Sequence, residues 1–541
     1  MIKKIVIAGA GFSGWYTALS LLQNVPGIRI TIVGSSKIPK LQVGEAMAFD
    51  GPYNLKKLLG FKDDRAFMRT TGAIYKYGVK LDEFNGDNNV TYHGKIHNLK
   101  IGSLAKFYSA FDYPDYYETW SARPGDAGVI ETWLWAHQQN PRTMNQFVDD
   151  IIDAQYFSSR PVAPYDANNN YILRPNDGFS YHFDADKTAI LMRDICIANF
   201  ADQVKEIDAV IQDVEQDHNG HIVGVVSDSH KKIVGDMYLD LTGFRRVIMS
   251  QLDNQSWIDH SRYAPDTAMV YPRKYTDPHT EMVGATTFSG LEHGWGFKIN
   301  LYHRTGNGYC YMSSMAEKDK IHEYLQSRAG DYKVNNPLVI SWKSGYYERP
   351  CHGNTIAFGL ASGLIHPFDG NLIHTHSRGL ENLIKLLNQP NLSIHDVETQ
   401  YNALQKPYLD EVALRMTLML GFSTKSGNFW DLQRQRARDE HFLEQLQDIV
   451  EMKTKNINSQ LVNNWQQAYV RLAVSCNVDV SKFNLQKPTD RDLEMFTAFC
   501  QYNQARNKYI RESEWPNYYE WLKENRFDGK TSDEIFDELN Y

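Results

Sequence analysis

Short apolar runs separated by a helical pattern open the chain. Residues 3–8 are apolar and rich in β-branched side chains, which is typical of a buried parallel strand. Apolar positions then recur at helical spacing over residues 15–23, and residues 28–33 form the next apolar run. This order predicts a βαβ unit that starts at the first residues of the chain.

The same pattern predicts a second sheet and two helical regions further along. A hairpin is expected where His218-Asn219-Gly220 joins two apolar stretches. The remaining expected elements are a helix over 185–201, strands at 209–215, 222–227 and 237–241, an antiparallel sheet over 266–345, and helices over 376–421 and most of 435–541.

These elements predict an α/β fold with a Rossmann-like nucleotide-binding domain, an inserted antiparallel β-sheet substrate domain and a helical C-terminal region. The core is expected over residues 1–430 and the C-terminal region over 431–541. Within the core, nucleotide-binding segments are expected at about 1–80, 180–250 and 350–400, with the sheet insert at about 266–345.

Composition narrows the classes of function. A chain of 541 residues is too long to form a single hydrophobic core, so we expect two or three packed units. Its content of 42% hydrophobic and 23% charged residues is typical of a globular protein. A net charge of −8 without a basic block argues against nucleic-acid binding. The five cysteines are scattered and form no Cys-x-x-Cys pair, so we expect a reduced, cytoplasmic protein. The sequence contains no run of 18 apolar residues, so we expect no membrane-spanning helix.

The strongest motif is the Gly-rich loop that follows the first strand, Gly9-Ala10-Gly11-Phe12-Ser13-Gly14. Gly9 permits a tight turn, Gly11 lets the backbone approach a pyrophosphate, and Gly14 lets the helix pack closely on the strand. The helix N-terminus favours the negative charge of the phosphates. Because the loop lies between a strand and a helix, it predicts dinucleotide binding.

The carboxylate that normally ends the second strand and holds the ribose is missing. Gly34 occupies this place and is followed by Ser35, Ser36 and Lys37. We expect these three polar residues to substitute for it as weaker hydrogen-bond partners.

Further motifs follow in a fixed order along the chain. They are Val43-Gly44-Glu45-Ala46, Ile74–Lys80 with Lys76 and Lys80 expected on one face of a strand, Tyr181–Ala185, Asp240–Gly243, Gly294–Ile299, Gly359–Gly363 and His366–Asn371. In this order, together with the N-terminal loop and Phe429-Trp430, they resemble the flavin-dependent tryptophan halogenases from residue 3 to about 430. The last hundred residues match no pattern that we can assign.

The resemblance implies FAD, used as FADH2 that a separate flavin reductase supplies. Reduced flavin and O2 then oxidise chloride, bromide or iodide to hypohalous acid, and a lysine presents the halogen to a small aromatic substrate. That lysine maps to Lys76, followed four residues later by Lys80. The implied cofactor-binding residues are Gly9, Ala10, Gly11, Phe12, Ser13, Gly14, Ser35, Ser36, Lys37, Val43, Gly44, Glu45, Ala46, Asp240, Gly243, Gly359 and Leu360.

The family glutamate near that lysine maps to Asp369, which keeps the carboxylate but is one methylene shorter. General acid–base catalysis needs heavy atoms within about 3 Å, so the shortening matters unless the backbone moves closer. The halide is expected beside the backbone amides of Gly370, Asn371 and Leu372, which replace the family's Ser-Thr-Gly.

Aromatic positions implied for the substrate region differ from the family. The Trp-x-Trp-x-Ile-Pro signature becomes Trp295, Phe297 and Asn300, and a His-x-Phe pair becomes Ser109 and Phe111. Phe297 keeps an aromatic wall, and Phe111 can stack on an aromatic ring. We therefore expect an electron-rich aromatic other than free tryptophan.

Two other functions stay open on the residues alone. An aromatic hydroxylase uses the same flavin fold, and the altered signature favours it somewhat, whereas Lys76 favours halogenation. The third hypothesis is a flavin-binding protein without turnover. The presence of both Lys76 and Asp369 argues against it. His366, Asp369, His374 and His376 could form a metal cluster, but the spacing of His374 and His376 suits a strand rather than a helix face. We expect no metal site, because the resemblance already accounts for this segment.

Overall fold

In a computed structural model, residues 2–38, 44–47, 51–84, 90–94, 129–143, 155–172, 180–329, 332–366, 371–451 and 478–539 are described, together with five single residues between them. A six-stranded sheet in the order β20-β21-β12-β1-β2-β8 contains the N-terminal βαβ unit. Its strands are β1 Lys4–Ala8, β2 Arg29–Gly34, β8 Val204–Asp208, β12 Met237–Asp240, β21 Thr355–Ala357 and the antiparallel edge strand β20 Cys351–His352.

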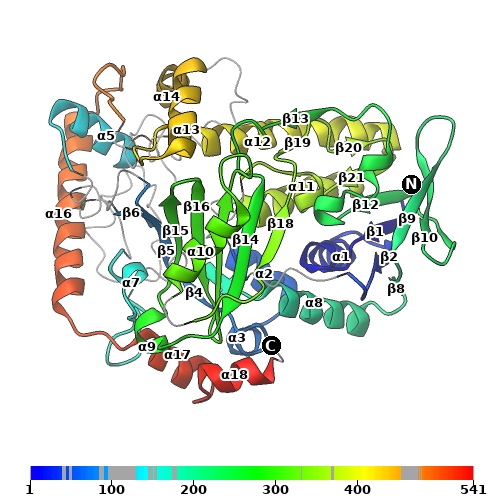
Figure 1. The fold of residues 1–541 in the computed structure, drawn as a ribbon, viewed down its shortest axis with the longest axis horizontal. Helices are drawn as coiled ribbons and strands as arrows, with labels where there is room; N and C mark the ends of the chain where they lie inside the picture. Colours follow the sequence, from blue (N-terminus) through cyan, green and yellow to red (C-terminus); the bar gives the residue numbers. More distant parts are fainter. Residues whose placement is uncertain are drawn as a thin grey trace.

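The side-chain period of β1 explains the layers on this sheet. Ile5 and Ile7 face a core shared with α1 (Phe12–Asn24), α8 (Ala185–Asn199) and α11 (Asn371–Leu387). The alternate residues of β1, Val6 and Ala8, face a small sheet that contains the predicted hairpin. That sheet consists of β9 Ile211–Gln216, β10 Ile222–Ser227 and β11 Lys232–Ile233, and it lies at the right-hand end of Figure 1.

A seven-stranded sheet forms the centre of the molecule, in the order β18-β14-β17-β16-β15-β5-β6. Its strands are β5 Gly78–Asp82, β6 Val90–Gly94, β14 Thr267–Arg273, β15 Ala285–Leu291, β16 Gly294–Asn300, β17 Thr305–Tyr311 and β18 Leu338–Ser341. All pairs are antiparallel except β15 with β5. α10 (Lys318–Arg328) packs on one face, and the opposite face shares a core with α13 (Asn428–Asp439) and α14 (Phe442–Val450).

Two three-stranded sheets join these layers. One has the order β3 (Glu45–Ala46), β7 (Ser180–Phe183) and β4 (Ile74–Lys76), and the other has β13 (Trp257–Asp259), β19 (Gly345–Tyr347) and β22 (Gly363–Leu364). The remaining helices are α2 Gly51–Leu59, α3 Arg65–Thr71, α5 Val129–Gln139, α7 Gln155–Ser159, α9 Pro278–Glu281, α12 Ile394–Gly421, α16 Asp490–Glu512, α17 Tyr518–Arg526, α18 Ser532–Glu538 and the 3₁₀ turns η2 Gly243–Arg245, η3 Met249–Gln251 and η4 Gly359–Ala361.

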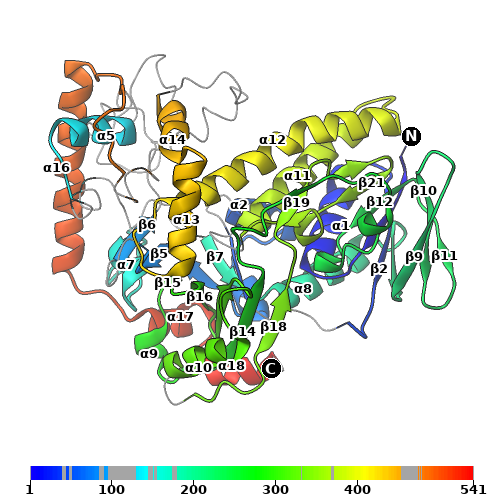
Figure 2. The same cartoon turned by 45° about the horizontal axis from the view of Figure 1, so that its top comes forward.

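The C-terminal helices return to the beginning of the chain. α16 runs along one end of the molecule, and α17 and α18 lie beneath the central sheet, close to α3 and α9 (Figures 1 and 2). The last described residues therefore pack against elements of the first hundred.

Three points refine or add to the expectations. The helical region expected over 376–421 begins at Asn371 and consists of two helices, with a break after Leu387 and with Ser393 capping the second helix. The segment 266–345 contains α10 and gains β5 and β6 from the N-terminal part of the chain. Strand β8 was not predicted, because only two of its five residues are apolar and it lies at the edge of the sheet.

No helix among the described residues is long and apolar enough to cross a bilayer. All five cysteines are buried thiols without a disulfide.

Candidate functional site

The Gly-rich loop has the geometry that its spacing predicts. Gly9 has φ +114°, and a Cβ there would lie 2.3 Å from the carbonyl oxygen of Leu241. A Cβ on Gly14 would lie 1.9 Å from the carbonyl oxygen of Gly9. Both positions are therefore closed to any side chain, and they bring β1, α1 and β12 into close contact.

Gly11 differs from its two neighbours. A Cβ at this position would meet nothing within 4 Å, so the peptide faces open space. Gly11 is also the N-cap of α1, and no side chain caps the helix. An uncapped helix N-terminus beside an open glycine fits the pyrophosphate of FAD.

The end of β2 explains why the ribose carboxylate is absent there. A Cβ on Gly34 would lie 2.4 Å from the Cβ of Ala10, so the loop itself requires glycine. In the register of the sheet, Gly34 pairs with Asp208 of β8. The Asp208 carboxylate accepts hydrogen bonds from the backbone N–H (2.9 Å) and hydroxyl (2.7 Å) of Ser36.

The other two predicted polar residues are held in the same turn. The Ser35 hydroxyl accepts a hydrogen bond from the Lys37 N–H at 3.2 Å, and Lys37 pairs with Asp228 at 3.0 Å. A carboxylate therefore does lie at this edge of the sheet, but the next strand supplies it. Sequence reasoning missed Asp208 because it missed β8.

Asp240 ends β12 and is fully buried. Its carboxylate accepts hydrogen bonds from the N–H (3.0 Å) and hydroxyl (2.6 Å) of Thr242, and from the N–H groups of Ile248 and Met249, both at 2.9 Å. These four bonds hold the turn around Gly243, which has φ +66°. Asp240 thus organises the loop that follows β12.

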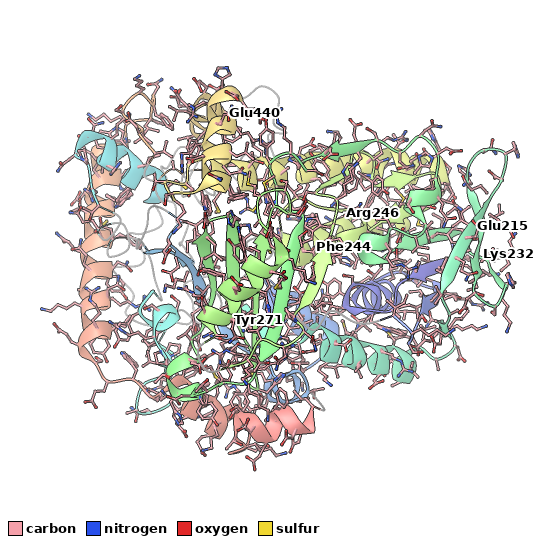
Figure 3. All side chains as sticks on the ribbon, in the orientation of Figure 1. Glu215, Lys232, Phe244, Arg246, Tyr271 and Glu440 are labelled. Atoms are coloured by element: carbon pink, nitrogen blue, oxygen red, sulfur yellow. The ribbon has the colours of Figure 1, made fainter. Side chains whose placement is uncertain are left out.

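Side chains after Gly243 anchor this loop to the centre of the molecule. Phe244 stacks on Trp342 with a centroid distance of 5.7 Å, and the Arg246 guanidinium lies 4.0 Å from the centroid of the Trp257 ring. Figure 3 labels Phe244 and Arg246 between the central sheet and the parallel sheet.

Gly359 brings the end of β21 to the Gly-rich loop. It has φ +56° and opens the turn η4, in which Leu360 follows. A Cβ on Gly359 would lie 3.4 Å from both the Ser13 hydroxyl and Nδ1 of His376. His376 is buried, its Nε2 lies 2.9 Å from the Thr17 hydroxyl, and burial lowers its pKa to about 3. This imidazole is neutral at physiological pH.

The Val-Gly-Glu-Ala segment forms β3 beside β7. Val43 lies outside the described residues, Gly44 has φ +75° and packs on Ile299 and Leu301, and Glu45 and Ala46 pair with Phe183 and His182. Burial, and then the charge of Asp184, raises the pKa of Glu45 to about 7.

Lys76 is buried, with 4% of its surface exposed. It is the last residue of β4 and pairs with Ser180 of β7. Its Nζ donates a hydrogen bond to the carbonyl oxygen of Met47 at 3.1 Å, and the Ser180 hydroxyl donates to the same oxygen at 3.0 Å. A lysine buried to this extent is rare and needs polar neighbours.

The prediction that Lys76 and Lys80 share one face of a strand is wrong. The chain leaves the three-stranded sheet after Lys76 and enters the central sheet at Gly78. Lys80 then lies on β5, with 28% of its side chain exposed, and pairs with Asp82 at 3.1 Å. Alternation holds only within one continuous strand, so it did not apply here.

His182 is an ionisable residue close to Lys76, and the sequence did not identify it as a site residue. It is fully buried, and its Nε2 lies 2.7 Å from the Thr286 hydroxyl. Burial, and then the charge of Lys76, holds the pKa of His182 well below its usual value. The imidazole therefore stays neutral and does not repel Lys76.

Strand β7 connects the Gly-rich loop with Lys76. The ring of Phe12 lies 5.4 Å from that of Phe183, at one end of β7, and Ser180 beside Lys76 is at the other end. Three residue steps along a strand span roughly 10 Å. β7 thus separates its contact with the Gly-rich loop from Lys76 by the length of one short strand.

The aromatic signature lies on β16. Trp295 is fully buried and packs edge-to-face on Phe288 at 5.6 Å. Phe297, two residues further on the same face, pairs with Gly308, where a Cβ would lie 2.4 Å from the ring. Asn300 stands at the end of the signature, and its amide donates a hydrogen bond to the carbonyl oxygen of Val283 at 3.0 Å.

Several predicted residues cannot be placed. Asp369, Gly370, Ser109 and Phe111 lie outside the described residues. Asn371 begins α11, and Leu372 packs against the core shared by the central sheet and the C-terminal helices. Among the described residues no group of three or more His, Cys, Asp or Glu side chains could hold a metal ion.

Comparisons with known proteins agree with this arrangement. Residues 4–478 match the family model for tryptophan halogenases. The tryptophan 7-halogenase KtzQ of Kutzneria sp. (strain 744) is 24% identical over 402 residues, covering 71% of this chain and 69% of that protein. A tryptophan halogenase from Shewanella frigidimarina NCIMB 400 has the same fold, with a TM-score of 0.77, 19% identity and coverage of 98% and 99%. Xcc4156, a flavin-dependent halogenase from Xanthomonas campestris, gives a TM-score of 0.73, 21% identity and coverage of 97% and 98%.

Proposed function

The chain belongs to the tryptophan halogenase family and is a flavin-dependent halogenase, an oxidoreductase, and on this premise we propose that it halogenates an electron-rich aromatic substrate through hypohalous acid that Lys76 activates. The observation that carries the proposal is the burial of Lys76 at the end of β4, within reach of the Met47 carbonyl.

The residues that would hold FAD are those at the carboxyl ends of the parallel strands. Gly11 and the N-terminus of α1 would hold the pyrophosphate, the turn at Ser36 and Asp208 the ribose, and the loops at Gly243 and Gly359 the part nearer the flavin. This edge is where ligands bind in open α/β sheets, at the point between β1 and β12 where the strand order reverses. FAD would be supplied in its reduced form and, with O2, would provide the oxidising power that turns a halide into hypohalous acid.

Lys76 would act on the hypohalous acid. A lysine N–H that donates to the oxygen of the acid withdraws electrons from the O–halogen bond and makes the halogen more electrophilic. The aromatic carbon then forms a bond to the halogen, the O–halogen bond breaks, and the oxygen leaves as water after it takes up the proton that the lysine donates. A carboxylate at Asp369 would accept the proton that the ring carbon loses.

Charge at this centre is arranged in favour of that role. Neutral His182 adds no positive charge beside Lys76. The Met47 carbonyl oxygen holds the Nζ of Lys76 and is itself held by the Ser180 hydroxyl of β7.

The substrate we propose is an aromatic other than free tryptophan, because Ser109 and Phe111 replace the family's His-x-Phe pair. The halide would be chloride, bromide or iodide, and a separate flavin reductase would deliver FADH2.

One assay tests the proposal against its alternatives. The protein is supplied with FAD, a flavin reductase, NADH, O2, each halide in turn and a panel of phenols and indoles, and the products are weighed by mass spectrometry. We expect halogen mass shifts that vanish in Lys76→Ala and persist in Lys80→Ala, the matched exposed lysine. A gain of one oxygen that is indifferent to halide identifies a hydroxylase instead, and no mass change with any substrate identifies a flavin-binding protein without turnover.

A further inference from the structure

The strand that carries Lys76 is an edge strand, and a C-terminal helix covers its open side. β4 pairs with β7 on one side only, in the order β3-β7-β4. On the other side, the Tyr518 hydroxyl of α17 donates a hydrogen bond to the carbonyl oxygen of Tyr75 at 2.7 Å. This bond is buried and joins residues 443 positions apart. A side chain thus completes the hydrogen bonding of the edge where a further strand would.

The peptide group on the far side of Lys76 is held as well. The Tyr77 N–H donates to the carbonyl oxygen of Gly284 at 2.6 Å. The backbone therefore has an anchor directly before Lys76, at the Tyr75 carbonyl, and another directly after it. Only the first of these anchors comes from the C-terminal region.

The phenol of Tyr75 provides another link to α17. Tyr75 lies on the opposite face of β4 from Lys76 and pairs with Tyr181. Arg526 Nε donates to the Tyr75 hydroxyl at 2.6 Å, and that hydroxyl donates to the Asp64 carboxylate at 2.9 Å. Tyr181 donates to the same Asp64 oxygen at 2.8 Å. The buried carboxylate therefore joins α3, β4, β7 and α17 in one connected network.

Aromatic packing makes this contact rigid. The Arg526 guanidinium lies 4.7 Å from the centroid of the Trp521 ring and 5.4 Å from that of Tyr75. Tyr77 packs against Tyr518 at 5.7 Å. Residues on both sides of Lys76 in the sequence thus contact the same helix.

We propose that Tyr518 and Arg526 are positioning residues for Lys76, and that the C-terminal helix α17 sets the depth at which its Nζ meets the hypohalous acid. The proposal rests on the proposed function of Lys76. Catalytic geometry is sensitive at this scale, since a displacement of about 1 Å can cost ~100-fold in rate. A loosened β4 would let hypohalous acid escape before it reaches the substrate.

The decisive variant is Tyr518→Phe, which removes one hydroxyl and keeps the ring. Its matched control is Tyr302→Phe, because the Tyr302 hydroxyl also donates to a backbone carbonyl of the C-terminal region, but to that of Lys530 at 2.6 Å rather than to one of β4. The readouts are product formed per O2 consumed, hypohalous acid trapped by a soluble halogen acceptor, kcat, KM and FAD affinity.

We expect Tyr518→Phe to lower kcat about 10-fold and product per O2 by a similar factor, with more acid trapped and with KM and FAD affinity within about twofold of the unchanged protein. Tyr302→Phe should keep the product yield per O2. Equal yields in the two variants would overturn the inference.

A second variant covers loss of folding. If Tyr518→Phe fails to fold, Tyr75→Phe is used instead, because it removes the hydroxyl that joins Arg526 to Asp64. A lower product yield per O2 in this variant supports the positioning role, and an unchanged yield overturns it. The proposed function has its own separate test. If the Lys76→Ala variant still halogenates, the proposed role of Lys76 is overturned. If Lys76→Ala is inactive but Tyr518→Phe keeps the full product yield per O2, only the positioning role is overturned.

Discussion

Asp184 and Arg304 form a fully buried ion pair. The two groups are 2.7 Å apart, and their side chains are 1% and 0% exposed. Asp184 also caps α8, since its carboxylate accepts a hydrogen bond from the Lys187 N–H at 2.9 Å. One carboxylate therefore joins the start of a helix on the nucleotide-binding sheet to the turn between β16 and β17 of the central sheet.

Removing one partner of this pair should destabilise the protein strongly. Arg304→Ala leaves a buried carboxylate without its cation, which costs about 3–5 kcal/mol. The pair of Glu215 and Lys232 provides the control, because it is 2.6 Å long but 49% and 40% exposed on the hairpin sheet at the edge of the molecule (Figure 3). Lys232→Ala should cost less than about 1 kcal/mol. The urea midpoints of the FAD-free variants measure both losses of stability. Equal shifts for Arg304→Ala and Lys232→Ala would contradict the prediction that the buried pair matters more.

Glu45 should make stability depend on pH. Its folded pKa of about 7 lies above the ordinary 4.5, so the folded state holds the proton more tightly than the unfolded chain does. Stability from this group is complete below about pH 4.5 and is lost as the pH rises through 7. Glu45→Gln, which stays neutral, should therefore be more stable than the unchanged protein at pH 8.

The size of that gain is limited by the solvent contact that Glu45 keeps. We expect about 1–2 kcal/mol at pH 8 and a smaller difference at pH 5. Thermal melting of both FAD-free proteins across this range measures the difference. A gain that does not change with pH would show that Glu45 is not protonated in the folded protein.

Gly11 and Gly14 should respond differently to alanine. Gly14→Ala places a Cβ against the Gly9 carbonyl and should lower the melting temperature of the FAD-free protein. Gly11→Ala meets no protein atom and should leave that temperature unchanged, while it weakens FAD binding at least ~10-fold because the methyl group occupies the pyrophosphate position. Flavin fluorescence titration and melting curves separate the two effects. Unchanged FAD affinity in Gly11→Ala would place the cofactor elsewhere.

Asp240 should act on the fold even when FAD is absent. Asp240→Ala leaves the N–H groups of Thr242, Ile248 and Met249 without their acceptor, and each unsatisfied buried group costs about 1–3 kcal/mol. We therefore expect a lower melting temperature without cofactor. If only the stabilisation on adding FAD were reduced, Asp240 would be a direct cofactor contact instead.

Local spacing was enough to predict the Gly-rich loop, the βαβ unit and the hairpin at Gly220. Each depends on residues that are close in sequence, where φ angles and strand period impose the geometry directly. The alternation of β1 even separates its two cores, with Ile5 and Ile7 on one face and Val6 and Ala8 on the other. The collinear motifs similarly predicted the family, which the family model confirms.

Tertiary structure alone decided how distant segments complete the site. The carboxylate at the turn after β2 comes from Asp208 rather than from β2, because Ala10 fills the space beside Gly34. Lys76 and Lys80 separate because the chain changes sheets between them. The edge of β4 is closed by Tyr518, far along the chain. Spacing specifies conformation over a few residues, whereas contacts of this kind depend on which surfaces pack together, and only the folded chain determines that.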